Sequence, residues 1–419
     1  MKTIHSLFVC LLYLSCLSAQ NKPKINLSFF GSSVCQGTGA KDDKGYAWQF
    51  YNRNVIDTTK YKYHNASTGG DNTIKVEKFD RLTNKLYPTN PDFVVLGLSL
   101  GNEGIRNAID ENGMEQILEQ YRSRLLKLAD SLNSQDMKPI IVNCYAHSFF
   151  NEAHYKYTKE INEIINTWPY PSINVLGTID DYKGKWVKGY VNDPWHPNFE
   201  GHKEMSFAIV PTLFEAILMG KKTPFYDWNP SYITLKNKKE VNKPLAIMVK
   251  DTIHSFTMSF RFKKTENGSI AGFSANELEH TIDVEKFNLK YKNISIPFER
   301  HLDKWNHVVL SHSYANQKTH LYLNGNLLGE VEERLSPTQV YFGGTSKSVE
   351  LKDIALHRSA INADEVLHLF NKKFIQSSLE FYNPMTKIFN KNQLDNKAQS
   401  LTEIKIDSSQ QLIENSIGF

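Results

Sequence analysis

The chain has 419 residues, of which 40% are hydrophobic and 22% are charged, and its formal net charge at pH 7 is +4. This length exceeds what one hydrophobic core normally organises, so we expect two or three globular domains. The small net charge and the lack of a long basic run give no indication of nucleic acid as a partner.

The N-terminus has the pattern of a secretory leader. A lysine precedes an apolar stretch over residues 7–17, which is followed by the small residue Ala19. This pattern predicts a signal peptide over residues 1–19, with a lipoprotein anchored through Cys16 as the alternative. We therefore expect a secreted or periplasmic protein. No later apolar run is long enough to predict a transmembrane helix.

Strand-like and helix-like patterns alternate between residues 24 and 219. Strands are expected at 25–30, 61–65, 92–100, 139–144 and 173–179, and helices at 46–55, 71–86, 115–132, 160–166 and 199–219. Pro211 is expected to kink the last helix. This alternation predicts an α/β domain over residues 20–222 with a doubly wound, parallel, five-stranded sheet. The active site of such a sheet lies at the carboxyl ends of its strands.

The pattern changes after residue 222. Residues 223–243 are rich in Lys, Asn and Pro and predict a linker. Beyond them, short period-two segments predict strands at 256–262, 305–310, 320–323, 340–344, 351–357 and 401–406, with Asn324-Gly325 as a hairpin turn. One helix is expected near residues 364–371. These features predict an all-β sandwich over residues 244–419.

A candidate nucleophile follows the first predicted strand. Ser33 lies in Phe29-Phe30-Gly31-Ser32-Ser33, where an apolar run ends in a turn of small residues. A serine hydroxyl becomes nucleophilic when a base removes its proton. His196 is the candidate base, because Asp193 lies three residues upstream and could hold its far ring nitrogen. A second Asp-x-x-His, Asp251 to His254, is interpreted as coincidental because it lies in the β-rich half.

A serine mechanism also needs hydrogen-bond donors for the oxyanion that forms during acyl transfer. Two loops after neighbouring strands offer them. Gly70 ends the small-residue loop that follows the second strand, and Asn102 follows the third. The backbone amide of Ser33 would complete the set.

These residues resemble the four conserved blocks of the SGNH (GDSL-type) hydrolases. Ser33, Gly70, Asn102 and His196 occur in the family's order, and Asp193 occupies its Asp-x-x-His. The resemblance covers residues 24–219 and implies a flavodoxin-like three-layer fold and a serine esterase without metal or cofactor. It implies Ser33, His196 and Asp193 as catalytic residues, and the amides of Ser33 and Gly70 with the side chain of Asn102 as the oxyanion hole.

Two residues depart from that family pattern. Ser32 stands where the family usually has Asp, and Glu103 replaces the Asp that usually follows the asparagine. A competing nucleophile is also present, since Gly97-Leu98-Ser99-Leu100-Gly101 fits the Gly-x-Ser-x-Gly elbow. However, the helix that should follow such an elbow at once is delayed.

Other polar residues have both functional and structural interpretations. Trp195 and His147 are candidate substrate-binding residues, although each could simply stabilise its loop. His202 is interpreted as structural. Cys35 and Cys144 are the cysteines that remain after cleavage of the leader. Their spacing leaves it open whether they form a disulfide.

The second half resembles the laminin-G-like (concanavalin-type) jelly roll. The resemblance rests on Trp305-Asn306-His307-Val308-Val309, Leu321-Tyr322-Leu323-Asn324-Gly325 and Leu351-Lys352-Asp353-Ile354. It implies glycan or protein binding. The sequence as a whole predicts a secreted serine esterase that acts on acyl esters of carbohydrate, most simply acetyl esters. The alternatives are a lipid or thioester acyl hydrolase and a catalytically weak adhesion module that binds glycan or protein.

Overall fold

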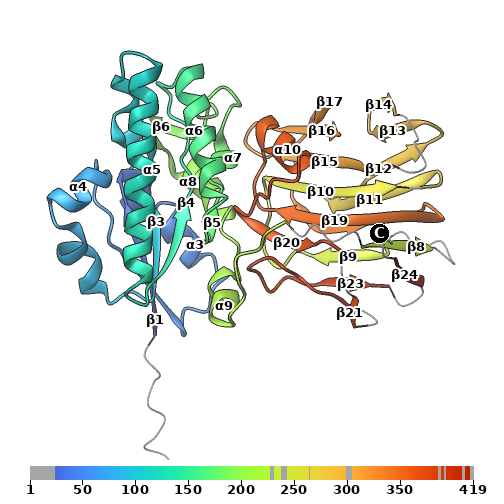
Figure 1. Cartoon of the computed structure of the whole chain (residues 1–419), viewed down its shortest axis with the longest axis horizontal. Helices are drawn as coiled ribbons and strands as arrows, with labels where there is room; N and C mark the ends of the chain where they lie inside the picture. Colours follow the sequence, from blue (N-terminus) through green and yellow to red (C-terminus); the bar gives the residue numbers. More distant parts are fainter. Residues whose placement is uncertain are drawn as a thin grey trace, which may run out of the picture.

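The computed structural model describes residues 24–226, 231–236, 243–263, 265–298, 304–385, 388–390, 393–407 and 411–415. The expected signal peptide and Cys16 lie outside the described residues. An α/β domain comes first in the chain and a β-rich domain follows, and the two lie side by side (Figure 1). Among the described residues, no helix combines the length and apolar character that a membrane crossing requires.

The α/β domain contains the expected parallel sheet. Its strands in the described part of the chain are β1 (Ile25–Gly31), β2 (Tyr61–Asn65), β3 (Phe93–Gly97), β4 (Lys138–Val142) and β5 (Ser172–Ile173), in the order β2-β1-β3-β4-β5. This is the flavodoxin-like order, in which the chain reverses direction across the sheet between β1 and β3. Every residue of β3 is buried, as expected for a strand covered on both faces.

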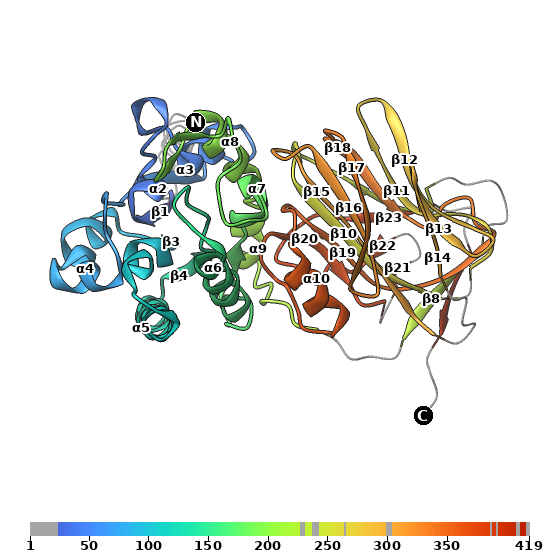
Figure 2. The same ribbon diagram turned by 90° about the horizontal axis from the view of Figure 1, so that it is seen from above.

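Helices cover both faces of this sheet (Figure 2). The helices are α2 (Ser33–Gln36), α3 (Tyr46–Asn52), α4 (Thr73–Lys78), α5 (Glu111–Asn133), α6 (Glu152–Ile165), α7 (Leu176–Ile179), α8 (Phe199–Phe207) and α9 (Leu213–Leu218). Phe29 packs with the residues of α3 and α9 on one face, and Phe30 packs with those of α5 and α6 on the other. Because successive side chains of β1 point to opposite faces of the sheet, this strand contributes to two separate hydrophobic cores.

Several expected helix boundaries were wrong. The helix expected at 160–166 begins at Glu152, because Asn151 and His154 form a capping box. The helix expected at 71–86 ends at Lys78, and a π-helical turn at Leu82–Leu86 follows it. The last helix is divided into α8 and α9 around Pro211 rather than kinked there.

The strand expected at 173–179 is also much shorter than predicted. Only Ser172 and Ile173 pair with β4, and α7 begins three residues later. The Asn174 side chain accepts a hydrogen bond from the Gly177 amide (3.1 Å), which favours the turn into α7. The edge of β5 is covered by the second domain: the Ser378 amide donates to the Ser172 carbonyl (3.0 Å), and the Asn174 amide donates to the Ser378 hydroxyl (2.8 Å).

The second domain is a sandwich of two antiparallel sheets, as expected. One sheet holds β8 (Tyr232–Lys236), β10 (Phe256–Lys263), β15 (Asn306–Ser313), β16 (Lys318–Leu323), β17 (Asn326–Glu332), β19 (Ser348–His357), β20 (Leu379–Asn383) and β24 (Gln411–Asn415). The other holds β9 (Leu245–Met248), β11 (Gly268–Ala275), β12 (Leu278–Glu285), β13 (Asn288–Tyr291), β14 (Ile294–Pro297), β18 (Pro337–Phe342), β21 (Ile388–Asn390), β22 (Gln393–Leu394) and β23 (Ile404–Ile406). Rings from the two sheets meet in the core, as Phe260 and Phe342 do with centroids 5.7 Å apart.

The hairpin turn and the helix of this domain agree with the sequence pattern. Asn324 and Gly325 both have positive φ (52° and 84°) between β16 and β17, which is why Asn-Gly suits the position. The helix α10 spans Ala363–Phe370. Two expectations fail: β8 lies within the predicted linker, and the tail after residue 384 contributes β21, β22 and β24 besides β23, where one strand was expected. Short strands at sheet edges carry too little pattern to be recognised in the sequence.

Candidate active site

Ser33 lies at the carboxyl end of β1, at the point where the sheet order reverses. The strand ends at Gly31, α2 begins with Ser33, and Gly37 ends this helix with φ 108°. A Cβ on Gly31 would lie 2.3 Å from the Gly97 carbonyl oxygen, so glycine is required where β1 and β3 converge. Because Ser33 is the first residue of α2, its backbone amide has no partner within the helix. That amide is therefore free to serve as a donor.

The structure brings Ser33, His196 and Asp193 together although 163 residues separate the serine from the histidine. The Ser33 Oγ lies 3.0 Å from the Nε2 of His196, and the Nδ1 of His196 lies 2.9 Å from the Oδ2 of Asp193. The hairpin of β6 (Val191–Asp193) and β7 (His196–Pro197) holds the last two residues. In the tautomer that satisfies both contacts, Nδ1 donates to the carboxylate and Nε2 accepts from the serine hydroxyl.

The environment of Asp193 favours its charged form. Partial burial raises the pKa of this carboxyl, but hydrogen bonds from the His196 ring and the Trp195 amide outweigh it and lower the pKa below its ordinary value. The Oδ1 of Asp193 accepts from the backbone amides of Trp195 (2.8 Å) and His196 (3.0 Å). The carboxylate thus fixes both the loop and the imidazole ring.

The two expected oxyanion loops lie against each other. Gly70 has φ 72°, a conformation that suits glycine, and its carbonyl accepts from the Lys75 ammonium (2.8 Å). The Asn102 side-chain amide donates to the Asp71 carbonyl (3.0 Å), and Asn72 donates back to the Asn102 carbonyl (3.1 Å). The second N–H of the Asn102 side chain is not used in this contact, which leaves it available to a substrate oxygen.

The two departures from the family pattern have structural roles. The Glu103 carboxylate accepts from the Thr73 amide (2.6 Å) and the Thr73 hydroxyl (2.9 Å), so it ties the Asn102 loop to the start of α4. Burial raises the pKa of Glu103, although the bonds from Thr73 oppose this shift. Ser32 is buried, and its hydroxyl lies 3.4 Å from that of Tyr145.

An aromatic wall lies beside the hairpin of β6 and β7. Trp195 packs against Phe149 (ring centroids 5.0 Å apart) and His147 (5.7 Å), and the Ser148 amide donates to the Pro194 carbonyl (3.1 Å). His147 is buried, which lowers its pKa to about 3 and keeps the ring neutral. Its two ring nitrogens have no hydrogen-bond partner among the described residues.

Sequence reasoning missed two residues of this wall. The guanidinium of Arg106 lies over the Trp195 ring, 4.0 Å from its centroid, and also over Phe149 (5.2 Å). Both are distances at which a cation is attracted to an aromatic face. Phe149 is 47% exposed. Neither residue belongs to a motif, so only the loop packing identifies them.

The competing candidates lie elsewhere or have other roles. Ser99 is fully buried, and its hydroxyl caps the turn Leu100–Glu103 by accepting from the Gly101 amide (3.4 Å). Cys35 and Cys144 are buried and unpaired thiols. Burial raises the pKa of both, so neither has the thiolate character of a nucleophile.

His202 is bonded at both ring nitrogens, to the Tyr46 amide (3.2 Å) and the Thr38 carbonyl (3.0 Å), which agrees with a structural role. The described residues contain no group of three or more His, Cys, Asp or Glu side chains arranged to hold a metal ion.

Comparisons with known proteins gave one family match and several remote structural similarities. The search of curated proteins found no match. Similar solved structures include a SAP-like pentraxin from Limulus polyphemus (16% identity, 45% of this chain and 96% of that chain, TM-score 0.31). They also include a putative carbohydrate binding protein from Bacteroides ovatus (12% identity, 45% and 60%, TM-score 0.36). A third is a catalytic mutant of Axe2, an acetylxylan esterase from Geobacillus stearothermophilus (14% identity, 45% and 94%, TM-score 0.34).

The family match covers the part of the chain that holds the site. Residues 27–209 match the model of the GDSL-like lipase/acylhydrolase family. This range includes every residue of the Ser33, His196 and Asp193 constellation and both oxyanion loops. The site therefore lies in a segment that is similar to the GDSL-like lipase/acylhydrolase family.

Proposed function

We propose that the chain is a serine esterase whose catalytic residues are Ser33, His196 and Asp193. The observation that carries this proposal is the continuous hydrogen-bonded series from the Ser33 hydroxyl through His196 to Asp193, with contacts of 3.0 and 2.9 Å. It lies within the acylhydrolase domain and at the strand ends where ligands bind in this fold. Because the contacts among these three residues are intact, the site does not support the alternative of a binding module without activity.

The geometry supports a two-step mechanism. The Nε2 of His196 removes the hydroxyl proton as the Ser33 Oγ attacks the ester carbonyl, and the same imidazole then donates that proton to the departing alcohol. A covalent acyl-serine remains. Water attacks it with His196 again acting as base, which releases the acid and restores Ser33. Asp193 stabilises the imidazolium that forms in each step, because its pKa is lowered and it stays ionised.

The oxyanion formed in each step needs preorganised donors. The Ser33 amide, the Gly70 amide and the Asn102 side chain are the proposed donors. The Asn102–Asp71 contact orients one N–H of the side-chain amide and thereby directs the other. Loss of a single such donor costs about 100-fold to 1000-fold in turnover in serine hydrolases.

For the substrate we propose acyl esters on carbohydrate, most simply acetyl esters, processed outside the cell. The leader pattern and the appended sandwich favour a secreted enzyme that acts on an extracellular polymer. The wall of Trp195 and Phe149 supports a sugar-bearing alcohol, because aromatic faces pack against the C–H faces of sugar rings. The exposed guanidinium of Arg106 on this wall does not suit a long acyl chain, so a lipid ester is the less favoured substrate.

The test compares wild type with Ser33→Ala and Ser99→Ala on p-nitrophenyl acetate and butyrate. Ser33→Ala should reduce turnover at least about 1000-fold, because the nucleophile is lost. Ser99→Ala is the matched control, since it removes the same hydroxyl from the rival Gly-x-Ser-x-Gly, and it should retain most activity. Circular dichroism verifies folding of each variant. Loss of activity in Ser99→Ala with retention in Ser33→Ala would overturn the assignment.

A further inference from the structure

A large cavity lies between the two domains, away from the proposed catalytic site. Its volume is about 1300 Å³, and residues of both domains line it. Lys138 begins β4 and Pro171 directly precedes β5, so the cavity lies at the amino ends of the parallel strands. Ser33 and Asn102 lie at the carboxyl ends of β1 and β3. The cavity and the active site are therefore at opposite edges of the sheet.

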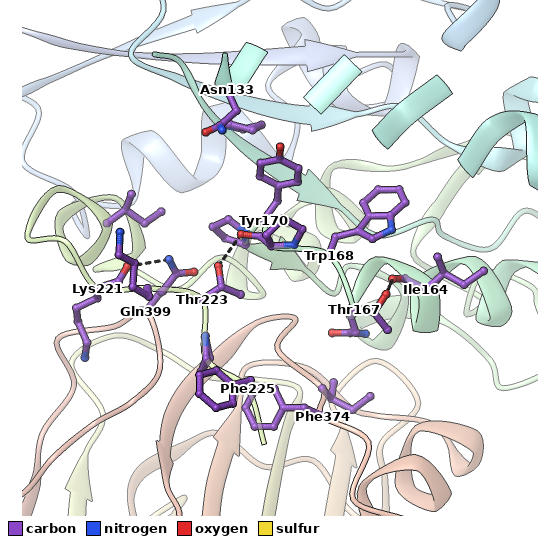
Figure 3. Close-up of a pocket in the computed structure, with 18 of the residues that line it drawn as sticks. Asn133, Ile164, Thr167, Trp168, Tyr170, Lys221, Thr223, Phe225, Phe374 and Gln399 are labelled. Atoms are coloured by element: carbon purple, nitrogen blue, oxygen red, sulfur yellow. Dashed lines mark hydrogen bonds between the residues drawn. The ribbon is translucent and has the colours of Figure 1, made fainter. Parts of the chain in front are cut away.

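The walls of this cavity combine aromatic rings from both sides. Figure 3 shows Trp168 and Tyr170 on the α/β side and Phe225 and Phe374 across from them. Trp168 and Tyr170 are nearly buried, whereas Phe225 is 77% exposed. Because an exposed phenylalanine at the mouth of a cavity is unfavourable in water, it suits a ligand with apolar faces.

The charge of the lining is strongly positive. The cations are Arg122, Lys138, Lys221, Lys222 and Lys373, whereas Glu163 is the one carboxylate among the described lining residues. Among the described residues, no acidic side chain lies within ion-pair distance of Lys138, Lys222 or Lys373.

Two of these lining residues, Lys221 and Glu163, refine this charge balance. The Lys221 ammonium donates to the carbonyls of Asn396 and Ser400, both at 2.6 Å, and so fixes the wall. Burial, with the neighbouring charge of Asp364, raises the pKa of Glu163 to about 7. This carboxyl is therefore only partly charged at neutral pH and offsets only part of one positive charge.

We infer that this cavity binds a segment of an acidic polysaccharide, with uronate carboxylates near Lys138, Lys222 and Lys373 and sugar faces against the aromatic walls. The inference rests on the proposed function, in which the substrate is an ester of carbohydrate. It adds a second binding site that holds the polymer outside the catalytic edge. Uronate chains suit the lining because each sugar offers both a carboxylate and an apolar C–H face.

Binding of unesterified polygalacturonate to the full mature chain tests this inference, with xylan as the neutral polymer and single-stranded DNA as the other polyanion. Isothermal titration calorimetry should detect polygalacturonate, with an affinity that falls as salt rises, and should detect xylan and DNA at least about tenfold more weakly. The variant K222E/K373E should lose about tenfold in affinity for polygalacturonate. The control K85E/K127E carries the same charge change on exposed lysines outside the cavity and should bind as wild type does.

Phe225→Ala provides a second, uncharged test and should weaken polygalacturonate binding about threefold through loss of stacking. K222Q/K373Q replaces the charge reversal if the first variant fails to fold by circular dichroism. Absence of polygalacturonate binding, equal binding of xylan or DNA, or equal affinity of wild type and the lysine variants would overturn the inference. The polymer carries no ester, so these results are independent of the hydrolysis assay that tests the proposed function.

Discussion

The sequence Asp-x-x-His occurs twice in the chain, and the two copies lie in very different surroundings. Asp193 and His196 contact each other across a partly exposed hairpin, with the imidazole Nδ1 2.9 Å from the carboxylate. The far nitrogen of the same ring contacts Ser33. The first copy therefore forms a pair whose unpaired ring nitrogen faces the Ser33 hydroxyl.

The second copy lies in the interface between the domains, and its two residues have separate partners. The Asp251 side chain, which is 8% exposed, pairs with Arg53 (2.8 Å) and Arg358 (3.5 Å). His254 instead contacts the Glu204 carboxylate (2.9 Å) and stacks on Tyr314 with centroids 3.7 Å apart. Arg53 and Glu204 belong to the α/β domain, so this copy joins the two domains.

The difference shows that an aspartate and a histidine three positions apart do not define a chemical function by themselves. In the first copy, a tight hairpin turns the two side chains toward each other. In the second copy, both side chains reach across to charged residues of the other domain: Asp251 to Arg53, which directly follows α3, and His254 to Glu204 in α8. The surrounding residues determine whether such an aspartate and histidine position a proton or hold two domains together.

The sharpest way to test this contrast is to remove each histidine in turn. His196→Ala should lower ester turnover by two to four orders of magnitude, because the proposed general base is lost. His254→Ala should lower the thermal stability, since it leaves the buried Glu204 without its partner, but a folded sample should hydrolyse p-nitrophenyl acetate at nearly the wild-type rate. Equal loss of turnover in both variants would show that the contrast is wrong.

For the aspartates, the second copy should matter more when stability is measured: Asp251→Ala should lower the free energy of unfolding more than Asp193→Ala does. Asp251→Ala leaves Arg358 with only the Glu380 carboxylate (2.7 Å) and Arg53 without an ion-pair partner among the described residues, and should cost about 2–3 kcal/mol of the free energy of unfolding. Asp193→Ala should cost less than about 1 kcal/mol, because the hairpin is partly exposed. Urea-induced unfolding followed by tryptophan fluorescence measures both. A larger loss for Asp193→Ala would contradict the comparison.

The pH dependence of stability should also distinguish the two regions. Glu365 is buried at the interface, where the Asn174 side-chain amide donates to it (3.0 Å), and burial raises its pKa to about 8. Its contribution is fully present below its unfolded pKa near 4.5 and is lost as the pH rises through about 8, because the folded state holds the extra proton. The opposite sign applies to Asp193, whose lowered pKa contributes stability that is lost only as the solution becomes strongly acidic.

Thermal unfolding of the full chain between pH 5 and 9 measures this effect. Stability should fall by at most about 1.4 kcal/mol per pH unit from Glu365, and Glu365→Gln should flatten that dependence because the amide cannot ionise. Glu152→Gln, on the exposed first turn of α6, is the matched control and should keep the wild-type slope. An unchanged slope in Glu365→Gln would assign the pH dependence to other groups.

The order of elements in the α/β domain could be predicted because each buried strand and amphipathic helix carries its own periodicity. The run Phe93-Val94-Val95-Leu96 indicated a strand buried on both faces, and β3 confirms it. The length of the edge strand β5 was not predicted, because the chain turns into α7 at Asn174, whose amide binds Ser378 of the other domain. The strand β8 inside the expected linker was missed for the same reason, since it pairs with β19 and β24 far along the chain.

The sequence alone indicated the α/β and all-β halves and pointed to Ser33, Asp193 and His196, because periodicity, small-residue turns and short motifs are local properties. Long-range packing established which Asp-x-x-His meets a serine, that Glu103 binds Thr73, and that Arg106 lies over Trp195. The joint between the domains, with its buried Arg358 and its basic cavity, also depends on contacts between residues more than one hundred positions apart. Such contacts arise from packing of whole domains, which no local pattern records.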